Sequence, residues 1–574
     1  MKKFFIIIFL LFFIVFIARS ILLYNIEPIG DHSFYIWWID TIINSEHFFP
    51  VKQIDYNFID SIKIDKLSFI HNLLLPIYIS VTNIFTTVSL LYFSFGNIFF
   101  EDIVASNIVL SIFANSLVIL MMPIYLFIFR KNYFNLSEVN FFAVLYIFLI
   151  SSSSFFFAFS TQGPHNLGIL FLYLYIIFFS KYLLNLKDEK NKKKFQIIFL
   201  FTQFLAFYSM YTNIFLIPFF IFANLMFFSE INFKKKIFEL FKISLFTFLI
   251  LTPGLIALIL IETFGIREDA STGFFGWGKW AFNFQQYSSN DINLNSNLFN
   301  TLTVYFSNNF KFWFEYNAIM IGRINLLLAL LGIILFKFKY NNPILLSLLV
   351  SHLFISLIMV GFNNASSRTY AYILPLLYFG IALVYFEIFK IIKKLKNKYT
   401  KISLTIFFIL FIILYQVKFN FYKFLDPGII KANWSQIYKV ENKELWKKLS
   451  NTIVNTISEN SLIIAPTSTY KYFLDTQINN TNYIFFSSLD TLKINPDTVT
   501  LLRYKSHIEK VINNNYKIYF LSFDKDNFKS QEPDLYKVFC KISNQICDNK
   551  FKLIKEIKSK STFWQNLYLF ELSY

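Results

Sequence analysis

Two groups of residues in this sequence have side chains suited to accepting a proton and to holding a phosphate. The first group, Asp31 with His32 and Tyr35, comes shortly after an N-terminal apolar run. A carboxylate such as Asp31 can accept the proton of an attacking hydroxyl or amine that lies within hydrogen-bond reach. The second group, Arg368 with Tyr370, lies between two apolar runs. A planar guanidinium such as that of Arg368 can hold two oxygens of a phosphate at once.

Composition indicates that a membrane surrounds the elements that position these residues. Of the 574 residues, 56% are hydrophobic and 21% are aromatic, and the mean hydropathy is +0.51. One water-soluble core cannot hide this much apolar surface, so lipid must cover the rest. The net charge of +18 comes from lysine clusters between apolar runs rather than along one face. This placement argues against nucleic-acid binding and suits cytoplasmic loops of a membrane protein.

Apolar stretches long enough to cross a bilayer predict about eleven transmembrane helices. The first begins after Lys2 and Lys3, as a signal peptide does, but it continues past Arg19 to Leu23 and no small-residue cleavage site follows. We therefore expect an uncleaved first span. The expected spans are 4–24, 104–129, 138–160, 165–184, 196–212, 213–230, 238–262, 321–336, 344–362, 369–389 and 402–420.

The lysine distribution predicts the orientation of the spans. Segment 67–95 is also apolar, and whether it crosses the membrane decides the side of everything after it. If it does not cross, every basic cluster lies on the side of the N-terminus, in agreement with the tendency of positive loops to stay in the cytoplasm. We therefore expect 67–95 to be a juxtamembrane or re-entrant helix, with the N-terminus cytoplasmic.

This orientation divides the chain into two predicted domains. Residues 1–420 form a transmembrane domain with long outer loops at 25–103 and 263–320, and residues 421–574 form an extracytoplasmic domain. In the second domain, apolar runs at 462–465, 483–486 and 518–521 alternate with helical patterns at 442–459, 503–514 and 533–546. This alternation predicts a small soluble α/β domain. The fold class is thus an α-helical polytopic membrane protein with a C-terminal α/β domain.

The first outer loop resembles the start of the GT-C membrane glycosyltransferases, a group that includes protein O-mannosyltransferases and the aminoarabinose transferases of lipid A. In these enzymes an acidic motif follows the first span, a tyrosine comes four residues after the acid, and a hydrophobic-proline element lies about twenty residues on. Asp31, Tyr35 and Pro50 have this order here. The second acid of the motif is replaced by His32. The resemblance implies a GT-C-like fold with Asp31 as the catalytic base.

The resemblance also implies a set of substrate-binding residues. Arg368 and Tyr370, followed by Pro375, are similar to an Arg-Tyr, then Pro, element at the outer end of a helix in these enzymes, where Arg368 would bind phosphate. His165 matches a polar turn of these enzymes by its position. The predicted substrate-binding residues are Arg368, His165, His32, Tyr35, Lys66, His71 and Tyr370.

The implied function is a glycosyltransferase of a bacterial inner membrane. Its partners would be membrane lipids, a polyprenyl-phosphate-linked sugar donor, and an extracytoplasmic acceptor that is a lipid, polysaccharide or protein. Transfer would invert the anomeric centre if Asp31 acts in one displacement. No nucleotide-phosphate loop or metal-ligand cluster is evident in the sequence, so we expect no metal or other cofactor.

Other classes of membrane protein remain as alternatives. A transporter or a flippase for lipid-linked sugars would place ionisable residues within the spans, whereas here Glu239 and Glu262 lie near span ends. An oligosaccharyltransferase would carry a Trp-Trp-Asp-Tyr-Gly-like motif after the last span, and none is present in the sequence.

Overall fold

A computed structural model describes most of the helical region and the strands of the C-terminal region. The described residues are 2–23, 85–97, 103–129, 134–160, 163–186, 188–228, 232–264, 298–359, 362–363, 366–425, 443–458, 461–465, 483–487, 517–522, 551–558 and 567–572. All structural statements below concern these residues.

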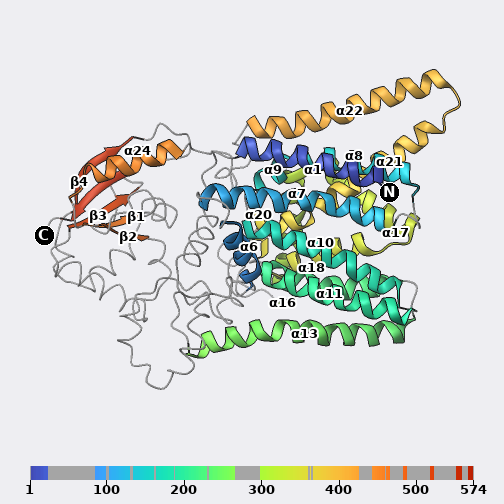
Figure 1. Cartoon of the computed structure of the whole chain (residues 1–574), viewed down its shortest axis with the longest axis horizontal. Coiled ribbons are helices and arrows are strands. Elements are labelled where there is room, and N and C mark those ends of the chain that lie inside the picture. The colour runs from blue at the N-terminus through green and yellow to red at the C-terminus, as the bar shows by residue number, and fades with distance from the viewer. Residues whose placement is uncertain are drawn as a thin grey trace.

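Long apolar helices packed side by side form the larger part of the structure (Figure 1). In chain order they are α1 (Lys2–Leu23), α6 (Thr87–Asn97), α7 (Ile103–Phe129), α8 (Leu136–Ser151), α9 (Ser154–Phe159), α10 (Gly163–Leu184), α11 (Glu189–Ser209), α12 (Thr212–Phe227), α13 (Phe233–Phe264), α16 (Leu298–Ile321), α17 (Arg323–Tyr340), α18 (Ile344–Ile358), α20 (Ser366–Tyr370), the 3-10 turn η4 (Ala371–Ile373), α21 (Leu374–Lys393) and α22 (Lys398–Leu425).

Every expected span coincides with at least one of these helices, which confirms a largely helical membrane fold. Among the described residues, six helices are long and apolar enough to cross a membrane, or seven if α16 and α17, which are bent by 106° at Gly322, count as one span. The other expected spans fall on helices such as α12 and α18, which have 16 and 15 residues. The count of eleven spans stays a prediction.

The expected span 138–160 is broken in the structure. Four serines, 151–154, interrupt its apolar sequence. The Ser152 hydroxyl donates to the Leu149 carbonyl, and the Ser153 hydroxyl accepts from the Phe156 amide at 3.2 Å. Because serine hydroxyls compete for backbone groups, they end one helix and begin the next. The result is α8 followed by the short α9.

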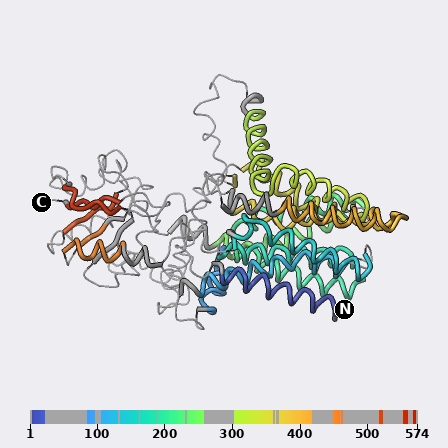
Figure 2. The backbone as a smooth tube through the Cα atoms, turned by 90° about the horizontal axis from the view of Figure 1, so that it is seen from above, coloured from blue at the N-terminus to red at the C-terminus, as the bar shows by residue number. Residues whose placement is uncertain are grey.

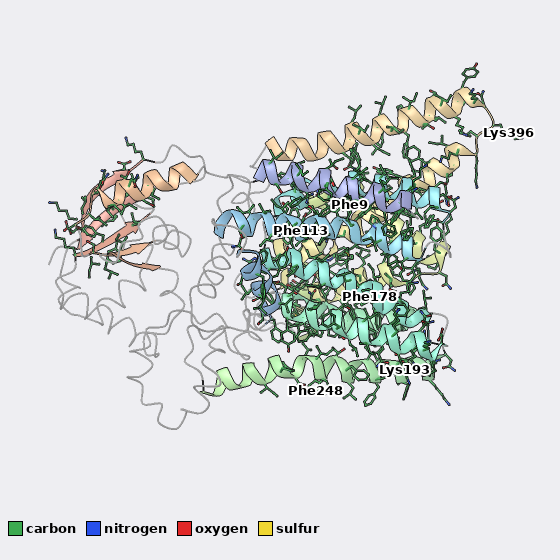
Figure 3. All side chains as sticks on the ribbon, in the orientation of Figure 1. Phe9, Phe113, Phe178, Lys193, Phe248 and Lys396 are labelled. Atoms are coloured by element: carbon green, nitrogen blue, oxygen red, sulfur yellow. The ribbon has the colours of Figure 1, made fainter. Side chains whose placement is uncertain are left out.

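Among the helices long enough to cross a membrane, α21 is the most deeply buried, followed by α7 and α10, whereas α1, α13 and α22 lie at the periphery and present apolar side chains outward. Phe9 and Phe248, labelled in Figure 3, are 62% and 59% exposed, as expected of side chains that face lipid. Helices α17 and α21 approach closely at Gly332 and Gly380, where a Cβ on either residue would collide with backbone of the other helix.

The two ends of the bundle differ in charge. Lys193 and Lys396, labelled in Figure 3, lie at the end where the N-terminus lies. The pairs Lys192–Glu239 and Lys390–Glu138, each 2.9 Å between nitrogen and oxygen, join elements at this same end. We call it the basic end, and the opposite end, which contains α20, the Arg368 end.

Helix α16 occupies part of the segment 263–320 that the sequence indicated as an outer loop. Figure 2 shows this helix, in yellow-green, running across the direction of the other helices, in keeping with its 106° bend from α17. Its exposed apolar residues include Phe306 and Phe310, whereas Tyr305 and Trp313 are buried against the bundle. The helix thus covers part of the Arg368 end.

Beyond the Arg368 end, Figure 1 shows a small sheet with one helix, α24 (Lys443–Val454). Its strands are β1 (Ser461–Ala465), β2 (Tyr483–Ser487), β3 (Lys517–Ser522), β4 (Phe551–Ile557) and β5 (Leu567–Leu572), in the order β2-β1-β3-β5-β4. Strands β1, β2 and β3 are parallel, and they fall on the three apolar runs that predicted strands. The antiparallel pair β4 and β5 was not predicted. The expected helices 503–514 and 533–546 lie outside the described residues.

Candidate functional site

Arg368 lies in a short helical segment that leads into the most buried helix of the bundle. Helix α20 continues through the turn η4 into α21, which has Pro375 in its first turn. Arg368 itself is half-buried, whereas Thr369 and Tyr370 beside it are almost completely buried. A long cationic side chain is thus attached to a backbone that its neighbours hold in place.

His352 of α18 is the first residue that holds the backbone next to Arg368 in place. The Trp313 indole nitrogen donates to His352 Nδ1 at 3.0 Å, so that ring nitrogen is an acceptor. The ring hydrogen must then be on Nε2, which lies 3.2 Å from the Thr369 carbonyl oxygen and donates to it. His352 is completely buried. The neutral imidazole therefore ties α16 and α18 to the residue that follows Arg368.

A second chain of hydrogen bonds holds Tyr370. Its hydroxyl donates to Asn363 Oδ1 at 2.9 Å, and Asn363 Nδ2 donates to Asn309 Oδ1 at 3.1 Å. The Thr369 hydroxyl donates to the Phe362 carbonyl at 2.8 Å. The Tyr370 hydroxyl thus has a partner within the protein, and its predicted contact with substrate stays a prediction.

The partners on α16 share one face of that helix. Tyr305, Asn309 and Trp313 follow each other at four-residue intervals, which places them in one row. Tyr305 donates to the Ile358 carbonyl, and Asn309 Nδ2 donates to the Leu357 carbonyl, both at 3.0 Å. This spacing was the sequence signal for a helix with a hydrogen-bonding face, and the loop interpretation of 263–320 missed it.

His165 lies at the start of α10. It is close to α20 and η4, residues 366–373, which we call the Arg368 segment. It is completely buried, and its ring meets Phe159 and Tyr372 edge-on, with centroids 6.1 Å and 6.5 Å away. Tyr372 follows Arg368 by four residues, and its carbonyl accepts from the Tyr173 hydroxyl at 3.0 Å. The structure therefore brings His165 and the Arg368 segment together. Their place on the outer face of the membrane stays a prediction.

A buried polar network connects α10 to the first span. Asn166 Nδ2 donates to the Phe159 carbonyl at 2.9 Å and to the Ser111 hydroxyl at 3.0 Å, while its Oδ1 accepts from Asn115 Nδ2 at 2.8 Å. Arg19 of α1 completes the network by donating to Asn115 Oδ1.

Arg19 was not among the predicted site residues, because it is a single charged residue inside an apolar run. It is 3% exposed, and its guanidinium carbon lies 5.6 Å and 5.8 Å from the ring centroids of Phe156 and Phe157. A buried cation held by an amide and two aromatic faces fixes the end of α1. Asp31 follows that end by eight residues.

Five of the predicted site residues lie outside the described residues, so their predicted roles stay predictions. They are Asp31, His32, Tyr35, Lys66 and His71.

The described end of segment 67–95 includes the first residues of α6, where the Ser89 hydroxyl donates to the Ser209 carbonyl at 2.7 Å. This contact places α6 against the end of α11, and whether 67–95 crosses the membrane stays undecided by its described part.

Within the described ranges, no three His, Cys, Asp or Glu side chains gather as a metal site would require. The hydrogen-bonded side chains described above are neutral apart from Arg19, and Arg368 adds a second guanidinium at the same end of the bundle. Such a set can bind an anion such as a phosphate.

Comparison with solved structures shows that the chain has the fold of the GT-C membrane glycosyltransferases. ArnT from Cupriavidus metallidurans in the apo state matches with a TM-score of 0.50 and 8% identity, over 97% of each chain. The archaeal oligosaccharyltransferase AglB from Archaeoglobus fulgidus, in complex with an inhibitory peptide and a dolichol-phosphate, matches with a TM-score of 0.50 and 12% identity, over 97% of this chain and 74% of that one. No protein-family model and no curated protein sequence matches the chain.

Proposed function

We propose that the chain is a membrane glycosyltransferase that moves a sugar from a polyprenyl-phosphate carrier to an acceptor outside the cytoplasm. The fold shared with GT-C enzymes supports this class of reaction. The observation that carries it for this chain is the anchored Arg368 segment, where two hydrogen-bonded chains hold Thr369 and Tyr370, the two residues that follow one half-buried arginine.

The reaction is a single displacement at the anomeric carbon of the donor. The acceptor oxygen or nitrogen forms the new bond, Asp31 takes the acceptor proton, and the bond from the sugar to the phosphate oxygen breaks. Polyprenyl phosphate leaves as a weak base, so it needs positive charge and hydrogen-bond donors more than a general acid. Arg368 supplies both through its guanidinium.

The remaining predicted residues have supporting roles in this proposal. We assign substrate contacts to His165, His32, Tyr35, Lys66, His71 and Tyr370. The Arg368 end faces the periplasm of a bacterial inner membrane, and the basic end faces the cytoplasm. Residues 1–420 form the transmembrane domain, and residues 421–574 form a periplasmic domain. The reaction needs no metal in this scheme.

The test is a transfer assay on Asp31→Asn in membranes supplied with radiolabelled polyprenyl-phosphate sugars. Asparagine has nearly the same shape but cannot take the acceptor proton, so we expect turnover to fall by about 100-fold or more. Asp40→Asn changes another carboxylate of the same predicted loop and should leave turnover near that of the wild type. Retained transfer by a normally folded Asp31→Asn protein would remove the proposed base. Movement of a labelled solute across sealed vesicles, without any new glycoside, would identify a transporter instead.

A further inference from the structure

The basic end of the bundle contains a cavity that the proposed transfer reaction does not use. It has a volume of about 170 Å³ and lies where α7, α10 and α12 end and where α17 meets α18. Its walls include Phe129, Ser180, Asn224, Phe228 and Asn342. A cavity of about 150 Å³ can hold a molecule of six non-hydrogen atoms, so this cavity has room for a small polar group.

Asn224 is the residue that indicates a ligand. Its side chain is completely buried, and neither its amide oxygen nor its amide nitrogen has a hydrogen-bond partner in the structure. Buried amides are nearly always satisfied, because an unmade hydrogen bond destabilises the fold. The amide both donates and accepts, so a ligand hydroxyl would satisfy it well.

The neighbouring amide in the cavity wall is already engaged. Asn342 Nδ2 donates to the Tyr125 hydroxyl at 2.6 Å, and Asn342 Oδ1 accepts from the Ile344 amide at 3.1 Å. These bonds fix the turn between α17 and α18. The cavity wall is thus rigid at Asn342, and Asn224 is left as the group that calls for an external partner.

Three lysines contact residues in or next to the cavity wall. Lys181 Nζ lies 4.8 Å from the ring centroid of Phe129, which lines the cavity. Lys337 Nζ donates to the Phe227 carbonyl at 3.1 Å, and Lys236 Nζ donates to the Met226 carbonyl at 2.9 Å. Phe227 and Met226 are the two residues before the lining residue Phe228. Basic pockets between helix ends at a membrane surface favour anionic lipid headgroups.

We propose that this cavity binds the headgroup of an anionic phospholipid whose phosphate is esterified to a polyol, as in phosphatidylglycerol. The headgroup glycerol, with six non-hydrogen atoms, fits the cavity and exchanges hydrogen bonds with Asn224. The phosphodiester lies among Lys181, Lys236 and Lys337. A headgroup that ends in an ammonium, as in phosphatidylethanolamine, would instead bring a cation among three lysines.

The test is native mass spectrometry of the purified full chain with phosphatidylglycerol or phosphatidylethanolamine of the same acyl chains. We expect the wild type to retain phosphatidylglycerol about tenfold more strongly than phosphatidylethanolamine. A tenfold preference is the effect of about one charge-assisted hydrogen bond. Asn224→Leu, and separately the pair Lys181→Ala and Lys337→Ala, should reduce this preference to less than about threefold. Lys193→Ala removes an exposed lysine at the same end and should leave the preference unchanged.

Three results would overturn the proposal. The first is equal retention of both lipids by the wild type. The second is an unchanged preference in a folded Asn224→Leu protein or, should that variant fail to fold, in the double lysine variant. The third is binding of soluble glycerol 3-phosphate as strongly as of the lipid, which would identify a water-soluble phosphate ester as the ligand. The assay does not depend on transferase activity, so its outcome is separate from that of the proposed function.

Discussion

At the scale of single residues, Arg368 combines a half-buried side chain with two hydrogen-bonded neighbours, Thr369 and Tyr370. In the proposed reaction its guanidinium holds two oxygens of the donor phosphate, and a charge-assisted hydrogen bond contributes about 1.5–3 kcal/mol. We therefore expect Arg368→Gln to lower kcat/KM for the lipid-linked donor by about 10- to 100-fold. Arg368→Lys should lose less, because lysine keeps the charge without the paired geometry. Steady-state kinetics with varied donor concentration measure both.

The matched control for Arg368 is Arg323→Gln. Arg323 begins α17 and is exposed, so its loss removes the same charge without touching the anchored segment. Arg368 would have no specific contact with the phosphate if Arg368→Gln kept the kcat/KM of the wild type. The same would follow if Arg323→Gln lowered kcat/KM as much as Arg368→Gln does.

The residues of the candidate site were predictable where polar groups stand at the ends of apolar runs. Arg368 and His165 are of this kind, and the structure brings their segments together through Tyr372. Arg19 and His352 were not predictable in the same way, because each is a single ionisable residue inside a largely apolar run. Their partners, Asn115 and Trp313, lie 96 and 39 residues away, and only the packed helices show the pairing.

At the scale of elements, α16, α18 and α20 meet at the buried His352 ring. His352→Phe would remove the hydrogen bonds that the ring makes with the Trp313 N–H and the Thr369 carbonyl, and a buried donor that loses its partner costs about 1–3 kcal/mol. We expect a lower melting temperature in detergent and a higher donor KM, because Thr369 adjoins Arg368. His352→Gln should recover part of both, since its amide can accept from Trp313 and donate to Thr369.

Ser351→Ala is the control for this prediction, because the Ser351 hydroxyl bonds only within its own helix, to the Ser347 carbonyl at 2.6 Å. The positioning role of His352 would be wrong if His352→Phe lowered the melting temperature and left the donor KM unchanged. In that case the histidine would stabilise the fold without orienting Arg368.

Hydrophobic periodicity predicted the positions of most elements but not their interruptions. Each expected span contains a helix because long apolar runs have one stable form in lipid. The break at 152–153 depends on serine side chains bonding to backbone, and α16 was hidden by polar residues that the bundle buries. Strand β4 was missed because lysine and glutamate interrupt its apolar residues, as in many edge strands.

At the scale of the whole molecule, the proposed orientation separates the two ends of the bundle by a membrane. We expect Arg323→Cys to react with a membrane-impermeant thiol reagent from the periplasmic side, and Lys193→Cys to react from the cytoplasmic side. Both side chains are exposed, so access depends on the side of the membrane. The native Cys540 and Cys547 are first replaced by serine. Labelling is measured in intact cells, where the reagent reaches the periplasmic side, and in inverted vesicles, where it reaches the cytoplasmic side. Labelling of both positions from one side would refute the topology.

The most direct test of the central claim is the stereochemistry of transfer by the purified wild-type protein in proteoliposomes. A polyprenyl-phosphate sugar of known anomeric configuration is the donor, and NMR of the glycosylated product gives the configuration after transfer. A single displacement with Asp31 as base predicts the inverted anomer. Retention of configuration, or no transfer from any polyprenyl-phosphate sugar by a correctly folded protein, would contradict the account.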